Sequence, residues 1–125
     1  MVGAGYGAGA DGVNGRQFAL YLARDLHCIC GCVGREDTLV PNHRAGRGMG
    51  GSRVLDRPAN VIVMCSSVNG LIESNATWAK RARDYGWKLS RWQVPEDEPF
   101  YDLATREWYL IDNLYHRTIT EKAAA

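Results

Sequence analysis

The run Val61-Ile-Val-Met-Cys65 constrains the fold more than any other feature of the chain. Three adjacent β-branched residues followed by two further apolar ones predict a β-strand. Ser66 or Ser67 directly after it can cap a helix. Apolar residues at helical spacing continue to about Tyr85, and Gly86 is a suitable stop. A strand followed at once by a helix is therefore expected here.

A second, shorter strand is expected earlier, at Thr38-Leu-Val-Pro-Asn-His43. The polar, glycine-rich residues 44–58 lie between the two strands and contain four arginines. The two strands and the helix that follows them form a predicted β-β-α unit over about residues 38–85.

Other elements are expected on both sides of this unit. Residues 16–26 have apolar side chains at helical spacing, and Asn14-Gly15 is a plausible start signal. Residues 87–112 alternate aromatic and polar side chains, which predicts a β appendix of two or three short strands. The expected fold class is α+β, with one domain over residues 16–116.

The two ends of the chain have different compositions from this domain. Six of the first 15 residues are glycine, so 1–15 are expected to be a flexible leader. Residues 117–125 are expected to be a frayed tail.

Composition excludes several classes of protein. The chain has 125 residues, 46% of them hydrophobic and 23% charged, which favours one folded domain over general disorder. No apolar run approaches the roughly 20 residues needed to cross a bilayer. The beginning of the sequence lacks the pattern of a signal peptide, so a cytoplasmic protein is expected.

Three side chains that could take part in catalysis or metal binding lie at defined points of the β-β-α unit. His43 ends the first strand, Asn60 precedes the second, and Asn69 lies in the first turn of the helix. Histidine can act as a general base near neutral pH because its ordinary pKa lies there.

With their neighbours, these residues resemble phage-type HNH endonucleases, in a His-Asn-Asn variant of the ββα-metal superfamily. The resemblance covers roughly residues 26–112. It rests on Asn42-His43-Arg44, on the loop Arg47-Gly-Met-Gly-Gly-Ser52, on Asn60 with the strand after it, and on Asn69 with Leu71-Ile-Glu73.

The resemblance implies a treble-clef-like ββα-metal core and metal-dependent hydrolysis of DNA phosphodiester bonds. His43 would be the general base, Asn60 would orient it, and Asn42 and Asn69 would bind one magnesium or manganese ion at the scissile phosphate. The position of Asn42 is usually Asp or His in this family, and Mg²⁺ prefers a site with a carboxylate. Weak metal binding without DNA is therefore expected.

A second function stays open because of that departure. A catalytically degenerate HNH fold could bind nucleic acid or a host protein without cutting. Relatives in phages often serve in genome packaging or recombination, so partners of that kind are implied by the resemblance alone. A third alternative is a zinc module that contacts proteins through its aromatic C-terminal segment. The oligomeric state is not predicted.

Cysteine spacing gives two alternatives. Many members of the family hold a structural zinc ion with two Cys-x-x-Cys pairs, but here Val68 replaces the last cysteine. Zinc would need Cys65 and three of four closely spaced residues, and that crowding slightly favours buried free thiols over a metal site. The four residues are His27, Cys28, Cys30 and Cys32.

The net charge of +1 conceals an uneven distribution of charge. Basic residues gather in the middle of the chain, and acidic ones gather after residue 95. Arginine and glycine together suit contacts with phosphate. The residues predicted to contact DNA are Arg44, Arg47, Arg53, Arg57, Lys80 and Arg81.

Overall fold

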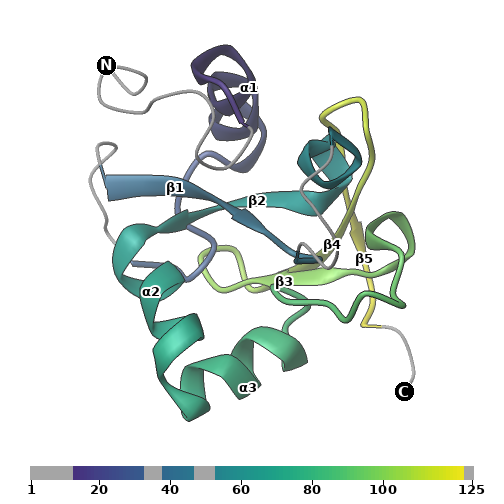
Figure 1. Ribbon diagram of the computed structural model, residues 1–125. Helices are drawn as coiled ribbons and strands as arrows, with labels where there is room; N and C mark the ends of the chain where they lie inside the picture. Colours follow the sequence, from purple (N-terminus) through teal and green to yellow (C-terminus); the bar gives the residue numbers. More distant parts are fainter. Residues whose placement is uncertain (1–12, 33–37, 47–52, 123–125) are drawn as a thin grey trace.

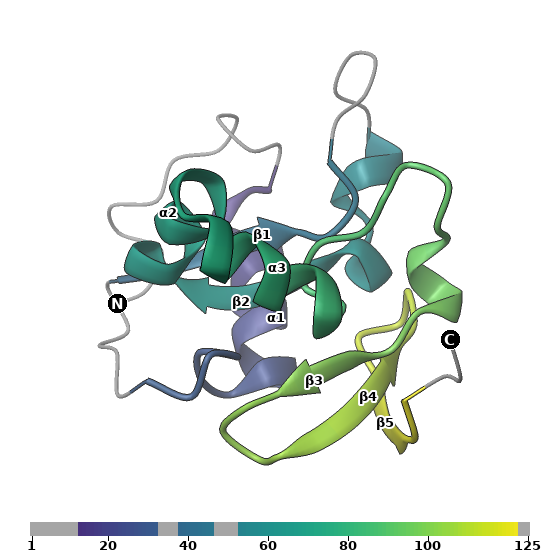
Figure 2. The ribbon, with the colours of Figure 1, turned by 90° about the horizontal axis from the view of Figure 1, so that it is seen from below.

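A pair of short strands lies at the centre of the molecule, covered by helices on both sides (Figures 1 and 2). The computed structural model describes residues 13–32, 38–46 and 53–122. The antiparallel strands β1 (Leu39–His43) and β2 (Val61–Cys65) form the pair. Helix α1 (Gly15–Asp25) covers one side, while α2 (Ser66–Ser74) and α3 (Ala76–Asp84) lie on the other. The predicted α+β class is confirmed.

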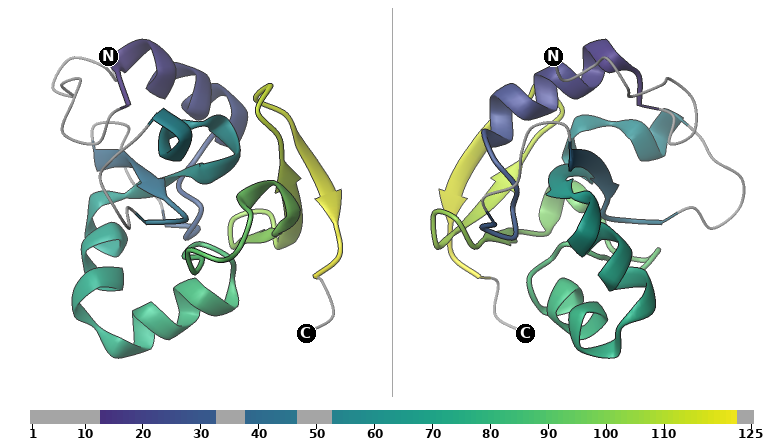
Figure 3. Two further views of the ribbon diagram at one scale, coloured as in Figure 1. Left: turned by 45° about the vertical axis from the view of Figure 1, so that its right-hand side comes forward. Right: turned by 90° about the vertical axis from the view of Figure 1, so that its left-hand side faces the viewer.

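The remaining strands form a second antiparallel sheet beside this pair, in the order β3-β4-β5 (Figure 3). They are β3 (Phe100–Asp102), β4 (Glu107–Ile111) and β5 (Arg117–Thr120). Short 3-10 turns connect the larger elements, at η2 (Arg53–Asp56), η3 (Pro58–Asn60) and η4 (Pro95–Asp97).

Strand β2 is buried at all five positions because it is covered on both faces. Its register with β1 pairs Leu39 with Cys65 at one end and Val61 with His43 at the other. Cys65 and His43 therefore lie at opposite ends of the strand pair. We call them the cysteine end and the histidine end.

Helix α1 begins where the sequence indicates. The side chain of Asn14 accepts a hydrogen bond from the Gln17 amide at 2.8 Å. The leader was predicted to include residues 13–15, but Val13 is completely buried and belongs to the folded core. Residues 1–12 lie outside the described part of the chain.

The single helix expected up to Tyr85 is wrong, because the chain breaks it at Asn75. This residue is extended, with φ −128° and ψ 123°, and its side chain accepts a hydrogen bond from the Trp78 amide that starts α3. An asparagine gains a local side-chain bond outside a helix, which explains the break. The expected serine cap of α2 is also wrong, because the Cys65 sulfur accepts from the Val68 amide.

Gly86 ends α3 as the sequence predicts. It has a positive φ of 73°, and a Cβ atom there would lie 2.1 Å from the Pro99 carbonyl oxygen. The reversal after it buries Trp87 completely, and the indole nitrogen donates to the Tyr101 carbonyl. This anchor connects the helical layer with β3.

The predicted frayed tail is wrong for residues 117–120, which form β5. Arg117 explains why this strand is ordered. Its guanidinium lies 2.6 Å from Asp102 and 3.4 Å from Asp25, two carboxylates that are completely buried. Removing a partner from a buried ion pair is costly, so this pairing fixes β5 against α1 and β3. Residues 123–125 lie outside the described part.

Within the described ranges, no helix is both long enough and apolar enough to span a membrane.

Candidate functional site

His43 lies at the end of β1 and forms a pair with Asp56. The imidazole Nε2 is 2.8 Å from the carboxylate Oδ1, and the two side chains are 15% and 16% exposed. A carboxylate on one imidazole nitrogen fixes the ring and favours a proton on that nitrogen. The other nitrogen, Nδ1, is then the one that can accept a proton.

The backbone of Asp56 is itself held from α1. The Tyr21 hydroxyl donates to the Asp56 carbonyl at 2.6 Å, and the Gln17 side-chain amide donates to the same oxygen at 3.3 Å. Burial is the main reason why the pKa of Tyr21 is raised, so the hydroxyl stays a donor. Asp56 was not among the predicted site residues. Its only signal in the sequence was being the one acid in an arginine-rich loop.

Asn60 closes the loop between the two strands. Its side-chain oxygen accepts from the Ala45 amide at 2.8 Å, and its nitrogen donates to the carbonyls of Ala45 and Leu55. Its backbone carbonyl accepts from the Arg44 amide. These contacts hold both chain segments that carry His43 and Asp56. Its expected part in orienting His43 stays a prediction.

Asn42 and His43 have partners on different elements. The Asn42 side chain is 1% exposed, and its nitrogen donates to the Trp87 carbonyl at 3.0 Å. Neighbouring residues of a strand direct their side chains to opposite faces, so Asn42 faces away from the His43–Asp56 pair. Within the described ranges, the Asn42 Oδ1 is fully buried and has no hydrogen-bond partner.

Lys88 connects the histidine end with α2. Its ammonium donates to the His43 carbonyl at 2.8 Å and lies 3.8 Å from a carboxylate oxygen of Glu73. Glu73 is one helical turn after Asn69, which is half-buried. Burial lowers the pKa of Lys88, and Glu73 partly opposes that shift. A lysine cation therefore lies on the side of the strand pair where the resemblance expects a metal ion.

This donor set does not form a magnesium site. Magnesium takes about six oxygen ligands and is usually bound through carboxylates. Asn42 offers one orphaned amide oxygen inside the core, and the Glu73 carboxylate faces the Lys88 ammonium. An ammonium beside the Glu73 carboxylate opposes the binding of a second cation there.

Arg44 corrects the prediction of a DNA contact at this position. Its side chain is completely buried and donates to four backbone carbonyls. Burial lowers its pKa to about 10, which leaves it charged at neutral pH. Arg44 therefore joins the β1 end to η3 and η4. The accepting carbonyls are those of Ala59, Gly86, Pro95 and Glu98.

The other predicted DNA contacts are scattered. Arg57 binds Glu96 with two nitrogens, at 2.6 and 2.9 Å, while the exposed Lys80 pairs with Asp84 at 2.7 Å. Arg81 lies over the Trp78 ring. Arg47 and the side chain of Arg53 lie outside the described part of the chain.

The four cysteines come together at the cysteine end. Their sulfur atoms all lie within 4.8 Å of one another, and the cluster could hold a metal ion. Cys28 and Cys65 are buried, Cys30 is half-buried and Cys32 is exposed. His27 is not part of this group, because its Nε2 is 3.1 Å from Asp102. The structure thus brings together the cysteines of the predicted ligand set and separates the histidine from them.

Backbone amides also point at the sulfurs. The Cys28 sulfur accepts from the Cys65 amide at 3.0 Å and from the Cys30 amide at 3.4 Å. The Cys28 thiol donates to the Cys30 sulfur at 3.0 Å, and this bond is the main cause that lowers the pKa of Cys30 to about 5. The same bond raises the pKa of Cys28, so it favours one anionic sulfur in the Cys28–Cys30 pair.

Comparisons with family models, with curated proteins and with solved structures found no match to this chain.

Proposed function

We propose that this protein is a phosphodiester hydrolase that cuts DNA, built on an HNH-type strand–strand–helix unit. The observation that carries the proposal is the His43–Asp56 pair at the end of β1. A half-buried histidine with one nitrogen on a carboxylate is arranged as a general base is. Its place at the strand end, with Asn60 closing the loop, supports the HNH assignment made from the sequence.

In the proposed reaction, the Nδ1 atom of His43 takes a proton from the attacking water. Asp56 holds the ring by Nε2 and stabilises the imidazolium that forms. The water oxygen attacks phosphorus, the bond from phosphorus to the leaving 3′ oxygen breaks, and that oxygen takes a proton from solvent. Lys88 supplies positive charge beside the backbone of His43, where it can offset the negative charge of the phosphate.

The magnesium or manganese ion expected from the resemblance enters this proposal only as a condition to vary in the assay. The donors at Asn42 and Asn69 do not fit a site formed by the protein alone. An ion that arrives with the phosphate would have to bring most of its own ligands. We therefore derive no step through it.

The same mismatch supports a second candidate function, a catalytically degenerate HNH fold that binds nucleic acid or a host protein without cutting. The buried Asn42 stands where the family usually has a metal-binding residue, and the Lys88 ammonium lies nearby. This combination favours the binding of anions over that of divalent cations. A binding protein needs the positive surface but not the His43–Asp56 pair.

For the cysteine end, we propose a structural zinc ion held by Cys28, Cys30, Cys32 and Cys65. Zinc–sulfur bonds of about 2.3 Å in a tetrahedron place the sulfurs about 3.8 Å apart. The separation of 3.9 Å between the Cys30 and Cys65 sulfurs fits this geometry, whereas the 3.0 Å between the Cys28 and Cys30 sulfurs would have to lengthen when zinc binds. Inductively coupled plasma mass spectrometry of purified protein tests it, with one zinc per chain expected and no metal as the contrary result.

The nuclease proposal is tested by nicking of supercoiled plasmid in magnesium, in manganese and without added divalent metal. Chelator is avoided in the main assay because it could also strip the cysteine end. His43→Ala is expected to reduce nicking about 100-fold or more. His116→Ala is the matched control, because His116 is an exposed histidine that also pairs with an aspartate. Equal nicking by both variants would refute the proposal.

A further inference from the structure

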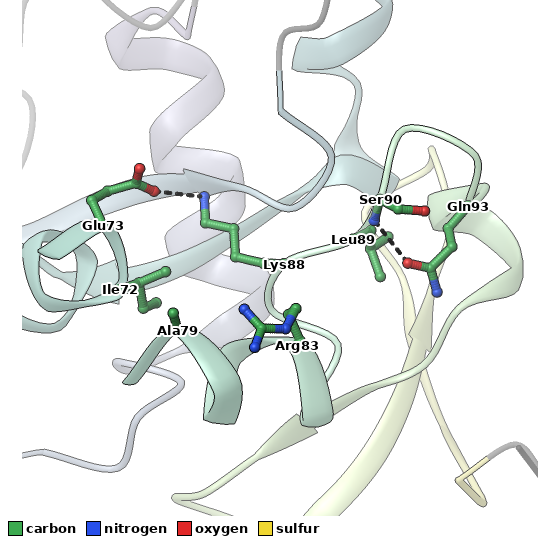
Figure 4. Close-up of a pocket in the computed structure, with 8 residues that line it drawn as sticks. All are labelled: Ile72, Glu73, Ala79, Arg83, Lys88, Leu89, Ser90 and Gln93. Carbon is green, nitrogen blue, oxygen red and sulfur yellow. Dashed lines mark hydrogen bonds and ion pairs between the residues drawn. The ribbon is translucent and has the colours of Figure 1, made fainter. Parts of the chain in front are cut away.

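A pocket of about 320 Å³ lies between α2, α3 and the segment that follows Trp87 (Figure 4). Ile72, Ala79 and Leu89 give it an apolar part, and the side chains of Arg83 and Lys88 lie between them. This volume is at the lower end of the range for small-molecule sites, roughly 300–1,000 Å³. The pocket is thus large enough for one nucleotide.

The charge around the pocket favours an anion. Its wall carries two cations, Arg83 and Lys88, and one carboxylate, Glu73. The Glu73 side chain is 72% exposed, whereas that of Lys88 is 26% exposed. An ammonium with little access to water gains from a second anionic partner, because burial has removed much of its hydration. Phosphate is the anion that a paired arginine and lysine bind well.

The pocket is connected to the histidine end through Lys88. The same ammonium that lines the pocket donates to the His43 carbonyl at 2.8 Å. A ligand that contacts Lys88 from the pocket therefore lies next to the backbone of the proposed base. Around the pocket, residues 76–93 contain five cations and one acid: Lys80, Arg81, Arg83, Lys88 and Arg91 against Asp84.

We propose that this pocket binds one nucleotide of a nucleic-acid strand, beside Lys88 and the backbone of His43. Arg83 and Lys88 contact a backbone phosphate of that nucleotide. Ile72, Ala79 and Leu89 pack against its base or sugar. The inference rests on the proposed function, because it names the part of the substrate that the site would hold.

Binding of a short fluorescent oligothymidylate tests the inference, measured by anisotropy without added divalent metal so that no cleavage is needed. Arg83→Ala is expected to weaken binding about tenfold and to reduce the salt slope by about 0.7–1. Ala79→Phe fills the pocket without changing charge, and it should weaken binding by a similar factor while leaving the salt slope unchanged. Arg83 is exposed, so its variant is expected to fold.

Arg16→Ala is the matched control, because Arg16 is an exposed arginine on α1, on the other side of the strand pair. It should change the affinity less than twofold. Two results would overturn the inference: no binding of the oligonucleotide by the parent protein, or equal losses in the two arginine variants with none in Ala79→Phe. Failure of the proposed function is a separate result, because it is read from plasmid nicking by His43→Ala.

Discussion

The two ends of the β1–β2 pair lie only a few residues apart along each strand, but they carry different chemistry. At the cysteine end, four sulfurs face one another and two of them are buried. At the histidine end, His43 and Asp56 keep partial exposure, and a lysine cation and an open pocket lie on the neighbouring face. A closed ligand set suits a structural role, whereas a site that works on a substrate needs an open position.

The two ends also differ in how they are held. Backbone amides within and next to the cysteine end contact its sulfurs. The histidine end depends on side chains from distant parts of the chain, because Tyr21 and Asn60 hold the backbone around Asp56. Substitutions at the cysteine end should therefore change stability most, and those at the histidine end should divide between stability and activity.

The largest effect is expected at the cysteine end. Cys65→Ser should remove a metal ligand while keeping a side-chain oxygen that can cap α2, and the loss of bound zinc should destabilise the fold by on the order of 3 kcal/mol or more. Chelator should lower the melting temperature of the parent protein and leave that of the variant unchanged. Calorimetry with and without chelator measures both. Equal shifts in the two proteins would contradict a role for the cysteines in holding metal.

Asn60→Ala should be nearly as disruptive at the histidine end. It removes three hydrogen bonds from a completely buried side chain, which costs about 2–4 kcal/mol when the partners stay buried. Asn113→Ala is the control, because this exposed asparagine also bonds to a backbone amide, and about 1 kcal/mol or less is expected there. Urea unfolding compares the two. Similar losses would show that burial of Asn60 adds nothing.

Asp56→Asn separates activity from stability. The amide keeps the shape but loses the charge that stabilises the imidazolium, so nicking should fall about ten- to a hundredfold. The melting temperature should change little. Asp112→Asn alters the exposed His116–Asp112 pair and should leave nicking unchanged. Nicking by Asp56→Asn at the parent rate would exclude Asp56 from the mechanism.

The smallest effect concerns acid stability near the histidine end. The Arg57 guanidinium lowers the pKa of Glu96 from 4.5 to about 2. Because the folded pKa is below the unfolded one, this pair stabilises the fold above about pH 4.5, and the contribution is lost as pH falls from there towards 2. Solvent screening limits it to about 1 kcal/mol. In urea unfolding measured at a series of pH values, Glu96→Gln should reduce the fall in unfolding free energy between about pH 4.5 and 2. Glu107→Gln should show the same fall as the parent protein.

Local patterns predicted much of the fold. The strand Val61–Cys65 appears with its predicted bounds, and Asn14 and Gly86 act at the helix ends as expected. Errors fell where a side chain had a choice between a local and a distant partner. Asn75 used its side chain as a cap instead of continuing the helix, and Arg117 found two buried carboxylates.

The charge pattern predicted a wrong contact for a related reason. Arg44 counted as part of a phosphate-binding loop, yet four carbonyls brought together from three segments enclose it. Nothing in the nearby sequence distinguishes an arginine that meets water from one that meets backbone oxygens. Asp56 was not predicted as a site residue, because only its contact with His43 in the folded structure gives it a role.

The sequence by itself therefore determined the strand–strand–helix order, the place of His43 at a strand end and the close spacing of Cys28, Cys30 and Cys32. These depend on neighbours along the chain, where propensity, capping and spacing act. Only the tertiary structure decided that His43 meets Asp56, that Asn42 turns into the core, that Arg44 is buried and that His27 leaves the cysteines for Asp102. Each of those outcomes depends on which distant groups come within a few ångströms once the core is packed.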